Sequence, residues 1–285
     1  MMLTRRRTIF CMSLVCLGLC FLYYQSQWTS NIAAINLWYD RSEPPPIPTI
    51  YVITPTYARL VQKAELTRIS NTFRLVPALH WIVVEDASEK TQLVTNFLSS
   101  CGIPYTHLNI RSPKDIRRAR GTLQRNLGLS WLREIFYPEE DPPGVVYFAD
   151  DDNTYSLELF EEMRYTKKVS VWPVAFVGGQ LYESVNVSNG KVVGWLVKYA
   201  VKRSFAIDMA GFAVNLKLIL EKPRAVFRLD VPPGYQEPSL LQDLVTLDEL
   251  EPRAANCTKI LVWHTKTLNP KVPLVKNSTK KTMEV

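Results

Sequence analysis

The sequence has few of the residues that build disulfide frameworks and metal clusters. Only five of its 285 residues are cysteine and three are histidine, and it contains neither a CxxC nor an HExxH motif. A zinc site therefore has little support. Cys11, Cys16 and Cys20 lie in an apolar N-terminal run. The remaining two, Cys101 and Cys257, either pair or stay free, and their spacing does not decide between these alternatives.

The sequence also lacks a block of basic residues interleaved with aromatics, an internal repeat and a low-complexity tract. Its 34 Lys and Arg against 27 Asp and Glu give a formal net charge of +7. This mild excess argues against nucleic-acid binding and suits an anionic ligand held by a few arginines. With 47% hydrophobic residues the chain can form one domain with an appendage.

The appendage lies at the N-terminus. Residues 9–24 carry no charge and follow Arg5, Arg6 and Arg7, which predicts a cytoplasmic tail over 1–8 and a transmembrane signal anchor over 9–24. A cleaved signal peptide is the alternative, but no clear small-x-small cleavage site follows. Prolines then indicate a short stem over 25–47, followed by a lumenal domain over 48–285.

Three Asn-x-Ser/Thr sequons fit a lumenal chain, at Asn186, Asn256 and Asn277. Such triplets also arise by chance, so which of them carry a glycan stays open.

Apolar strand patterns alternate with helical ones through the first half of the domain, which predicts an α/β fold with a mostly parallel sheet. We expect strands at Thr49–Thr54, at Leu79–Glu85 and just before Asp150, with helices at Val61–Phe73, Leu93–Ser99 and Thr122–Phe136. In the second half we expect strands at Val169–Val177, Lys191–Tyr199 and Lys259–His264, and a helix at Met209–Leu220.

The most informative motif joins a buried-strand pattern, Val145–Phe148, to three consecutive carboxylates, Asp150, Asp151 and Asp152. Such a junction places the acids at the carboxyl end of a strand, where open α/β sheets bind ligands. A divalent cation bridging to a nucleotide diphosphate would neutralise their mutual repulsion. A solvated acidic turn is the alternative.

Five motifs in order resemble the animal β-1,3-glucuronyltransferases, which make the proteoglycan linker and the HNK-1 epitope. They are Thr49–Tyr57, Trp81–Asp86, Asp150–Tyr155, Ile207–Phe212 and Leu261–Thr265. The resemblance covers about residues 48–267. It implies a GT-A nucleotide-sugar fold, UDP-glucuronate as donor, Mn²⁺ as cofactor, inversion at the anomeric carbon, a Golgi membrane protein of type II topology and a homodimer.

The resemblance also assigns donor-binding residues: Pro55, Tyr57, Asp86, Arg120, Arg125, Asp150, Asp151, Asp152, His264 and Lys266. Among them Tyr57 is expected to stack on uracil and Asp152 to ligate manganese directly. Arginine suits the carboxylate and the phosphates because it donates in a planar fork.

Glu237 is the predicted catalytic base, which removes the proton from the 3-hydroxyl of a terminal galactose. Pro238 follows it, so we expect a helix over 238–245 that Glu237 caps and whose N-terminus keeps the carboxylate ionised. The resemblance places Glu183, Tyr199, Arg203 and Asp208 at the acceptor.

Four residues depart from the family pattern: Ala119, Leu181, Pro238 and Lys266. The motifs favour an N-acetyllactosamine acceptor slightly over the galactosyl-galactosyl-xylose linker, and that choice stays open. A non-catalytic glycan-binding or sugar-nucleotide-binding relative, and a transferase that uses another UDP-sugar, are the alternative functions.

Overall fold

The computed structural model describes residues 18–30, 47–113, 120–137, 142–199 and 201–271 of the chain. The chain divides into two compact units, residues 1–46 and 47–285. In the first unit, residues 18–30 form an exposed helix. Within the described ranges no helix is both long enough and apolar enough to cross a membrane. Residues 9–17 of the expected anchor lie outside those ranges.

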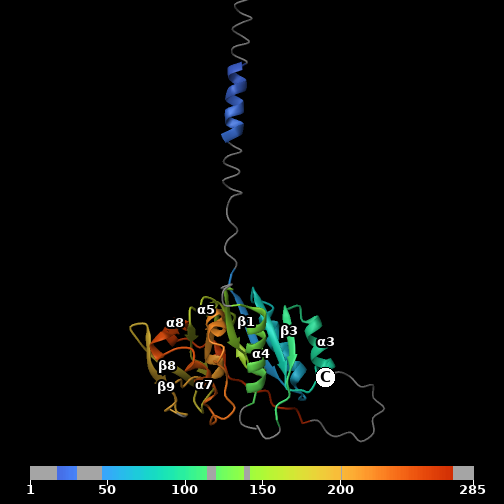
Figure 1. Ribbon diagram of the computed structural model, residues 1–285, viewed down its shortest axis with the longest axis vertical. Helices are drawn as coiled ribbons and strands as arrows, with labels where there is room; N and C mark the ends of the chain where they lie inside the picture. Colours follow the sequence, from blue (N-terminus) through green and yellow to red (C-terminus); the bar gives the residue numbers. More distant parts are fainter. Residues whose placement is uncertain (1–17, 31–46, 114–119, 138–141, 200, 272–285) are drawn as a thin grey trace, which may run out of the picture. The chain divides into compact units, whose positions relative to one another are not determined.

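The second unit is built on a sheet of seven strands in the order β11-β6-β10-β4-β1-β2-β3. Four neighbours, β1 (Thr49–Thr56), β2 (Leu79–Glu85), β3 (Tyr105–Asn109) and β4 (Gly144–Phe148), are parallel. β10 (Phe212–Asn215) runs antiparallel between β4 and β6 (Val169–Val171), and β11 (Leu250–Pro252) closes the edge parallel to β6. The expected α/β fold with a mostly parallel sheet is confirmed (Figure 1).

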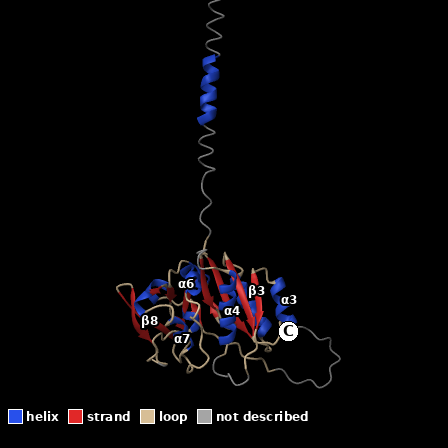
Figure 2. Cartoon of the chain, viewed as in Figure 1, coloured by secondary structure: helices blue, strands red, loops and turns tan. Residues whose placement is uncertain are grey.

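Helices cover both faces of this sheet (Figure 2). Successive strand residues point to opposite faces, so each strand contributes to two cores. In β1, Ile50 and Val52 face one core and Ile53 faces the other. The first core includes α2 (Gln62–Phe73), α3 (Gln92–Ser100) and α5 (Leu157–Arg164), and the second includes α4 (Thr122–Ile135), α6 (Leu216–Glu221) and α7 (Gln236–Leu241).

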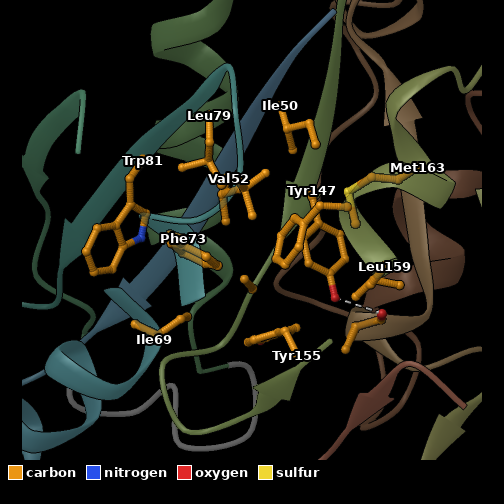
Figure 3. Close-up of a cluster of buried hydrophobic side chains, with 14 of the residues drawn as sticks. Ile50, Val52, Ile69, Phe73, Leu79, Trp81, Tyr147, Tyr155, Leu159 and Met163 are labelled. Carbon is orange, nitrogen blue, oxygen red and sulfur yellow. Dashed lines mark hydrogen bonds between the residues drawn. The ribbon is translucent and has the colours of Figure 1, made fainter. Parts of the chain in front are cut away.

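Aromatic side chains fill the first core. Phe73 of α2 meets Trp81 of β2 edge-on, with ring centroids 5.3 Å apart, and it packs against Phe160 of α5 in the same way. Figure 3 shows Tyr147 in this cluster, its hydroxyl donating to the carbonyl of Ala210 over 3.0 Å. The core is thereby tied to the turn that precedes β10.

A second sheet of five short strands has the order β5-β12-β7-β8-β9. These strands are β5 (Thr154–Tyr155), β12 (Val262–Trp263), β7 (Val174–Ala175), β8 (Tyr182–Ser188) and β9 (Lys191–Leu196). The remaining short elements are the 3₁₀ turns η2 (Met209–Gly211) and η3 (Leu247–Glu249), and α8 (Ala254–Cys257). The second sheet matters for the site because β5 begins two residues after the last of the three aspartates and β12 leads to His264.

The helix expected over residues 209–220 and the strand expected over Val169–Val177 are wrong. Residues 209–220 do not form one helix: they form η2, β10 and α6. The apolar run at Phe212–Val214 fits either structure by periodicity, and pairing with both β4 and β6 makes it a strand. The strand expected over Val169–Val177 is interrupted at Trp172–Pro173 into β6 and β7, which belong to different sheets. Proline cannot donate to a strand ladder.

Both cysteines of the second unit, Cys101 and Cys257, are buried and free. The sequence left open whether these two cysteines form a disulfide, and in the structure they do not.

Candidate functional site

The candidate site lies at the carboxyl edge of the parallel strands. Thr56 of β1 is paired with Glu85 of β2, and Ile53 of β1 with Phe148 of β4. The segments that follow these strands carry Tyr57, Asp86 and Asp150, so the three leave the sheet at one edge. β10 runs in the opposite direction and therefore begins at that edge.

The three consecutive aspartates have different partners. Asp150 accepts from Nη2 of Arg125 over 2.5 Å. Asp151 is buried, accepts from the Thr56 hydroxyl over 2.7 Å, and forms an ion pair with Arg59 over 2.7 Å. Burial outweighs the arginine and raises the pKa of Asp151 to about 6.

Asp152 differs from both neighbours. In the part of the chain that the structure describes, no hydrogen bond or ion pair holds its carboxylate, although its carbonyl accepts from Arg68 and Thr265. Burial raises the pKa of Asp152, and the charges of Asp150 and Glu65 add to the shift. An unpaired carboxylate beside two other acids is the oxygen ligand that a hard cation prefers.

The described residues contain no group of three or more His, Cys, Asp or Glu side chains that could by itself hold a metal ion. The donor set that fits a cation here is therefore Asp152 together with oxygens from outside the protein, such as diphosphate and water.

Arg59 is a site residue that the sequence analysis missed. Its guanidinium lies 4.5 Å from the centroid of the Tyr57 ring, and its Nη1 donates to the Tyr57 carbonyl over 3.1 Å. It also pairs with Asp151 and with the buried Glu65 of α2. One arginine thus connects the aromatic expected at uracil with the acidic triplet. The sequence did contain a signal for Arg59, because a basic residue stands two positions after Tyr57, which ends the first family motif.

The other donor-side residues lie around the start of α4. The carboxylate of Asp86 accepts from the backbone N–H of Ser112 over 2.7 Å. Arg125, buried in the first turns of α4, donates through Nη1 to the carbonyl of the exposed Arg120 over 3.2 Å. Gly121 caps α4 at φ 78°, and a Cβ there would come within 3.2 Å of the Pro55 ring. The departure at Ala119 lies outside the described residues.

His264 and Asp208 meet where the two sheets come together. Nδ1 of His264 lies 3.5 Å from Oδ2 of Asp208, and that carboxylate raises the pKa of His264 to about 9. The other oxygen of Asp208 accepts from the N–H of Ala210, which caps η2. His264 is thus an imidazolium at neutral pH. Lys266 follows it on the exposed segment after β12.

Glu183 and Arg203 form a buried pair nearby. Nη2 of Arg203 lies 4.0 Å from Oε2 of Glu183, and both side chains are at most 5% exposed. Oε1 of Glu183 is excluded from solvent and has no hydrogen-bond partner among the described residues. Burial raises the pKa of Glu183, and Arg203 offsets part of the shift. Arg203 also lies 5.7 Å from the ring of Tyr199.

Glu237 is the second residue of α7, and the N-cap is Tyr235. The expectation that Glu237 caps a helix over 238–245 is therefore wrong, because the helix begins one residue before it. Its Oε2 is excluded from solvent and has no partner within the described ranges. Burial, with the negative charge of Asp208, raises the pKa of Glu237 to about 8. The helix N-terminus therefore does not keep this carboxylate ionised.

Two of the three sequons lie in described segments. Asn186 is exposed on β8, and Asn256 is exposed in α8 with a left-handed φ of 54°. Asn277 lies outside the described residues.

Comparisons with known proteins assign the family. Residues 69–268 match the family model of glycosyltransferase family 43. The human galactosylgalactosylxylosylprotein 3-beta-glucuronosyltransferase 1 is 58% identical over 254 residues, which cover 84% of this chain and 76% of that protein. The dog galactosylgalactosylxylosylprotein 3-beta-glucuronosyltransferase 2 is 59% identical over 227 residues, 78% of this chain and 69% of that protein. The chain belongs to glycosyltransferase family 43 and is a glycosyltransferase of this type.

Among solved structures, the crystal structure of S. aureus TarS 1-349 superposes with a TM-score of 0.48 at 15% identity, over 76% of this chain and 60% of that chain.

Proposed function

We propose that this enzyme transfers glucuronate from UDP-glucuronate, with inversion, to the 3-hydroxyl of a terminal galactose on a glycoprotein or proteoglycan glycan. The observation that carries the proposal is the 58% identity, over 254 residues, to a transferase named for glucuronosyl transfer to a galactosylgalactosylxylosyl-protein. The carboxyl edge of a GT-A type sheet would be the donor site.

The donor would be held by cations on two sides. Arg125 and Arg59 already neutralise Asp150 and Asp151, so these two acids add little repulsion toward a diphosphate. Tyr57 offers an aromatic face to uracil, and the imidazolium of His264 supplies a positive charge toward the glucuronate or the phosphates. Asp86 would accept the uracil imide proton.

Asp152 would hold the manganese ion. When bound, that cation would stabilise the charge that develops on the leaving diphosphate. Its fit rests on the carboxylate of Asp152, which has no partner among the described residues and lies beside two aspartates that already have arginine partners.

Glu237 is the proposed base because its carboxyl has a pKa of about 8 and one oxygen with no partner among the described residues. A base with a pKa near the working pH removes a hydroxyl proton efficiently. Asp208 and Glu183 would accept hydrogen bonds from galactose hydroxyls, with Tyr199 and Arg203 at the same sugar.

The proposal extends to the setting of the enzyme. We place it in the Golgi membrane as a single-pass type II protein with a lumenal catalytic domain, acting as a homodimer. The support is the charge pattern of residues 1–24 and the family relationship.

The test is a screen of the purified chain against several UDP-sugars, with and without manganese. Acceptors ending in N-acetyllactosamine and in galactosyl-galactosyl-xylose are compared. UDP release should require UDP-glucuronate, manganese and a galactose-terminated acceptor together. Turnover with another UDP-sugar and none with UDP-glucuronate would overturn the donor assignment.

Asp152→Ala is the matched variant for the metal. It should abolish manganese-dependent UDP binding in calorimetry while the melting temperature stays near that of the wild type. Unchanged affinity in the folded variant would remove Asp152 from the metal site.

A further inference from the structure

The proposed catalytic helix α7 is joined to the donor-side helix α4 by a part-buried hydrogen bond. Thr122, the first residue of α4, is 1% exposed, and its hydroxyl donates to Oε1 of Gln236 over 2.8 Å. Gln236 is the first residue of α7 and directly precedes Glu237. The bond therefore connects the start of the helix that carries Arg125 with the start of the helix that carries the proposed base.

The Gln236 amide is fixed at its other end as well. Its Nε2 donates to the carbonyl of Arg228 over 2.7 Å. Asn126, one turn after Thr122 on α4, accepts from the N–H of Phe227 over 2.9 Å and donates to its carbonyl over 2.8 Å. Residues four apart share one helix face, so this face of α4 holds Phe227 as well as α7.

The loop that enters α7 is held from the acceptor side. The hydroxyl of Tyr199 donates to the carbonyl of Pro233 over 3.1 Å, and Nη1 of Arg203 donates to the carbonyl of Gly234 over 2.9 Å. The segment from Pro233 to Glu237 is thus bonded to the acceptor side at one end and to α4 at the other.

From this geometry we propose that Thr122 and Gln236 are positioning residues. Their hydrogen bond fixes the position of the Glu237 carboxylate relative to the donor, which would bind beside α4. The proposal rests on the proposed function, in which Glu237 is the base. Oε2 of Glu237 has no partner of its own among the described residues. The position of this oxygen therefore depends on the backbone of α7 and on the bonds that hold it.

Proton transfer in the transition state is sensitive to small displacements, whereas donor binding depends on Arg125, Tyr57 and the acids. A severed bond should therefore lower kcat more than it raises the donor KM. Thr122→Val keeps the shape of the side chain and removes the hydroxyl. We expect kcat to fall on the order of tenfold, with the donor KM changed by less than about threefold.

Three further variants distinguish a positioning role of the hydrogen bond from a general loss of stability. Thr122→Ser restores the hydroxyl and should recover most of the lost kcat. Thr166→Val is the matched control, because its buried hydroxyl also makes hydrogen bonds, to the Met163 carbonyl and to Ser170, but on the turn between α5 and β6. It should keep kcat at the wild-type value.

The third variant, Gln236→Met, removes the acceptor of the bond. In a Gln236→Met background, Thr122→Val should lower kcat no further, because the bond that it would break is already lost. An equal drop in both backgrounds would overturn the proposal, as would a kcat effect of Thr122→Val that matches that of Thr166→Val.

Failure of the positioning proposal can be distinguished from failure of the proposed function. If Glu237→Gln keeps wild-type turnover, the base assignment fails. If Glu237→Gln is inactive and Thr122→Val has wild-type kcat, or alters only the donor KM, the positioning proposal alone is overturned. Melting temperatures confirm that each variant is folded, and Gln236→Met serves as the informative variant if Thr122→Val is not.

Discussion

At the scale of single residues, Glu237 is half-buried, and one of its oxygens is excluded from solvent with no partner among the described residues. Desolvation of this carboxyl raises its pKa to about 8 from 4.5. Between those two pH values the folded protein holds a proton that the unfolded chain has released. The free energy of unfolding therefore falls as pH rises from about 4.5 to about 8. Catalytic competence at this residue is thus expected to reduce stability.

The first prediction follows from that linkage. Glu237→Gln should melt at a higher temperature than the wild type near pH 8, and the difference should shrink as pH falls toward 4.5. Melting curves of both proteins across this range provide the measurement. Parallel curves would mean that the carboxyl does not titrate with a raised pKa in the folded state. Turnover of the same variant should fall by about two to four orders of magnitude.

The second prediction concerns the pH dependence of activity. A base works in its deprotonated form, so kcat/KM should rise with pH and level off above an apparent pKa of about 8. Because Asp208 contributes to the raised pKa of Glu237, Asp208→Asn should move this limb to lower pH. Asp248→Asn, which removes a charge from the exposed η3, should leave the limb in place. If Asp208→Asn leaves the apparent pKa of the kcat/KM profile unchanged, the assigned interaction between Asp208 and Glu237 is contradicted.

The site residues show which parts of the chemistry could be predicted from the sequence. The acids, Arg125 of α4, Arg120 just before α4 and His264 were predicted from the sequence, and in the structure they lie near one edge of the sheet. How the acids divide their partners could not be predicted, because Arg59 reaches Asp151 only when β1 and β4 lie side by side. The raised pKa of Glu237 was equally out of reach, since burial of one carboxyl depends on packing from distant segments.

At the scale of elements, the start of α4 is the most constrained part of the donor side. Gly121 has φ 78°, and a Cβ on it would lie 2.6 Å from Nη1 of Arg125. This close approach requires glycine. The guanidinium can pair with Asp150 because no side chain stands at position 121.

The third prediction uses this contact. Gly121→Ala should displace the Arg125 guanidinium and raise the donor KM several-fold. Gly190→Ala is the control, because Gly190 has a similar φ of 72° with nothing within 4 Å of the added Cβ. Both substitutions strain the backbone, by roughly 1 kcal/mol or more, but only the first should change donor affinity, measured by UDP calorimetry. Equal donor affinities in the two variants would show that Gly121 is required only for the left-handed backbone conformation and not for the position of Arg125.

Element prediction from the sequence succeeded where local signals agreed with the fold. β2 was predicted with its observed bounds, and α4 with the same first residue, because both have clear periodicity and clear ends. β10 was missed because its strand conformation comes from pairing with β4 and β6. β3, β8 and α5 were not predicted at all. β3 is a five-residue strand at the edge of the large sheet, and a short edge strand depends on neighbours that local sequence does not identify.

At the scale of the whole molecule, the site is an assembly of two sheets. The large sheet supplies the edge with Tyr57, Asp86 and the acids, and the small sheet supplies His264 and Glu183. In the described residues, both hydrophobic cores draw their members from between Ile50 and Val262. The second unit therefore contains the packing that stabilises its own site.

The last prediction tests this self-sufficiency. A chain that begins at Ile47, the first residue of the second unit, should fold cooperatively and melt within about 2 °C of the full chain, because it keeps every described residue of both cores. Its kcat and donor KM toward a soluble galactose-terminated acceptor should match those of the full chain, because all predicted site residues are retained. Calorimetric melting and steady-state kinetics of the two proteins side by side provide the measurement. A lower melting temperature with intact kinetics would assign residues 1–46 a stabilising role, whereas a lost kcat at an unchanged melting temperature would place a functional contact in them.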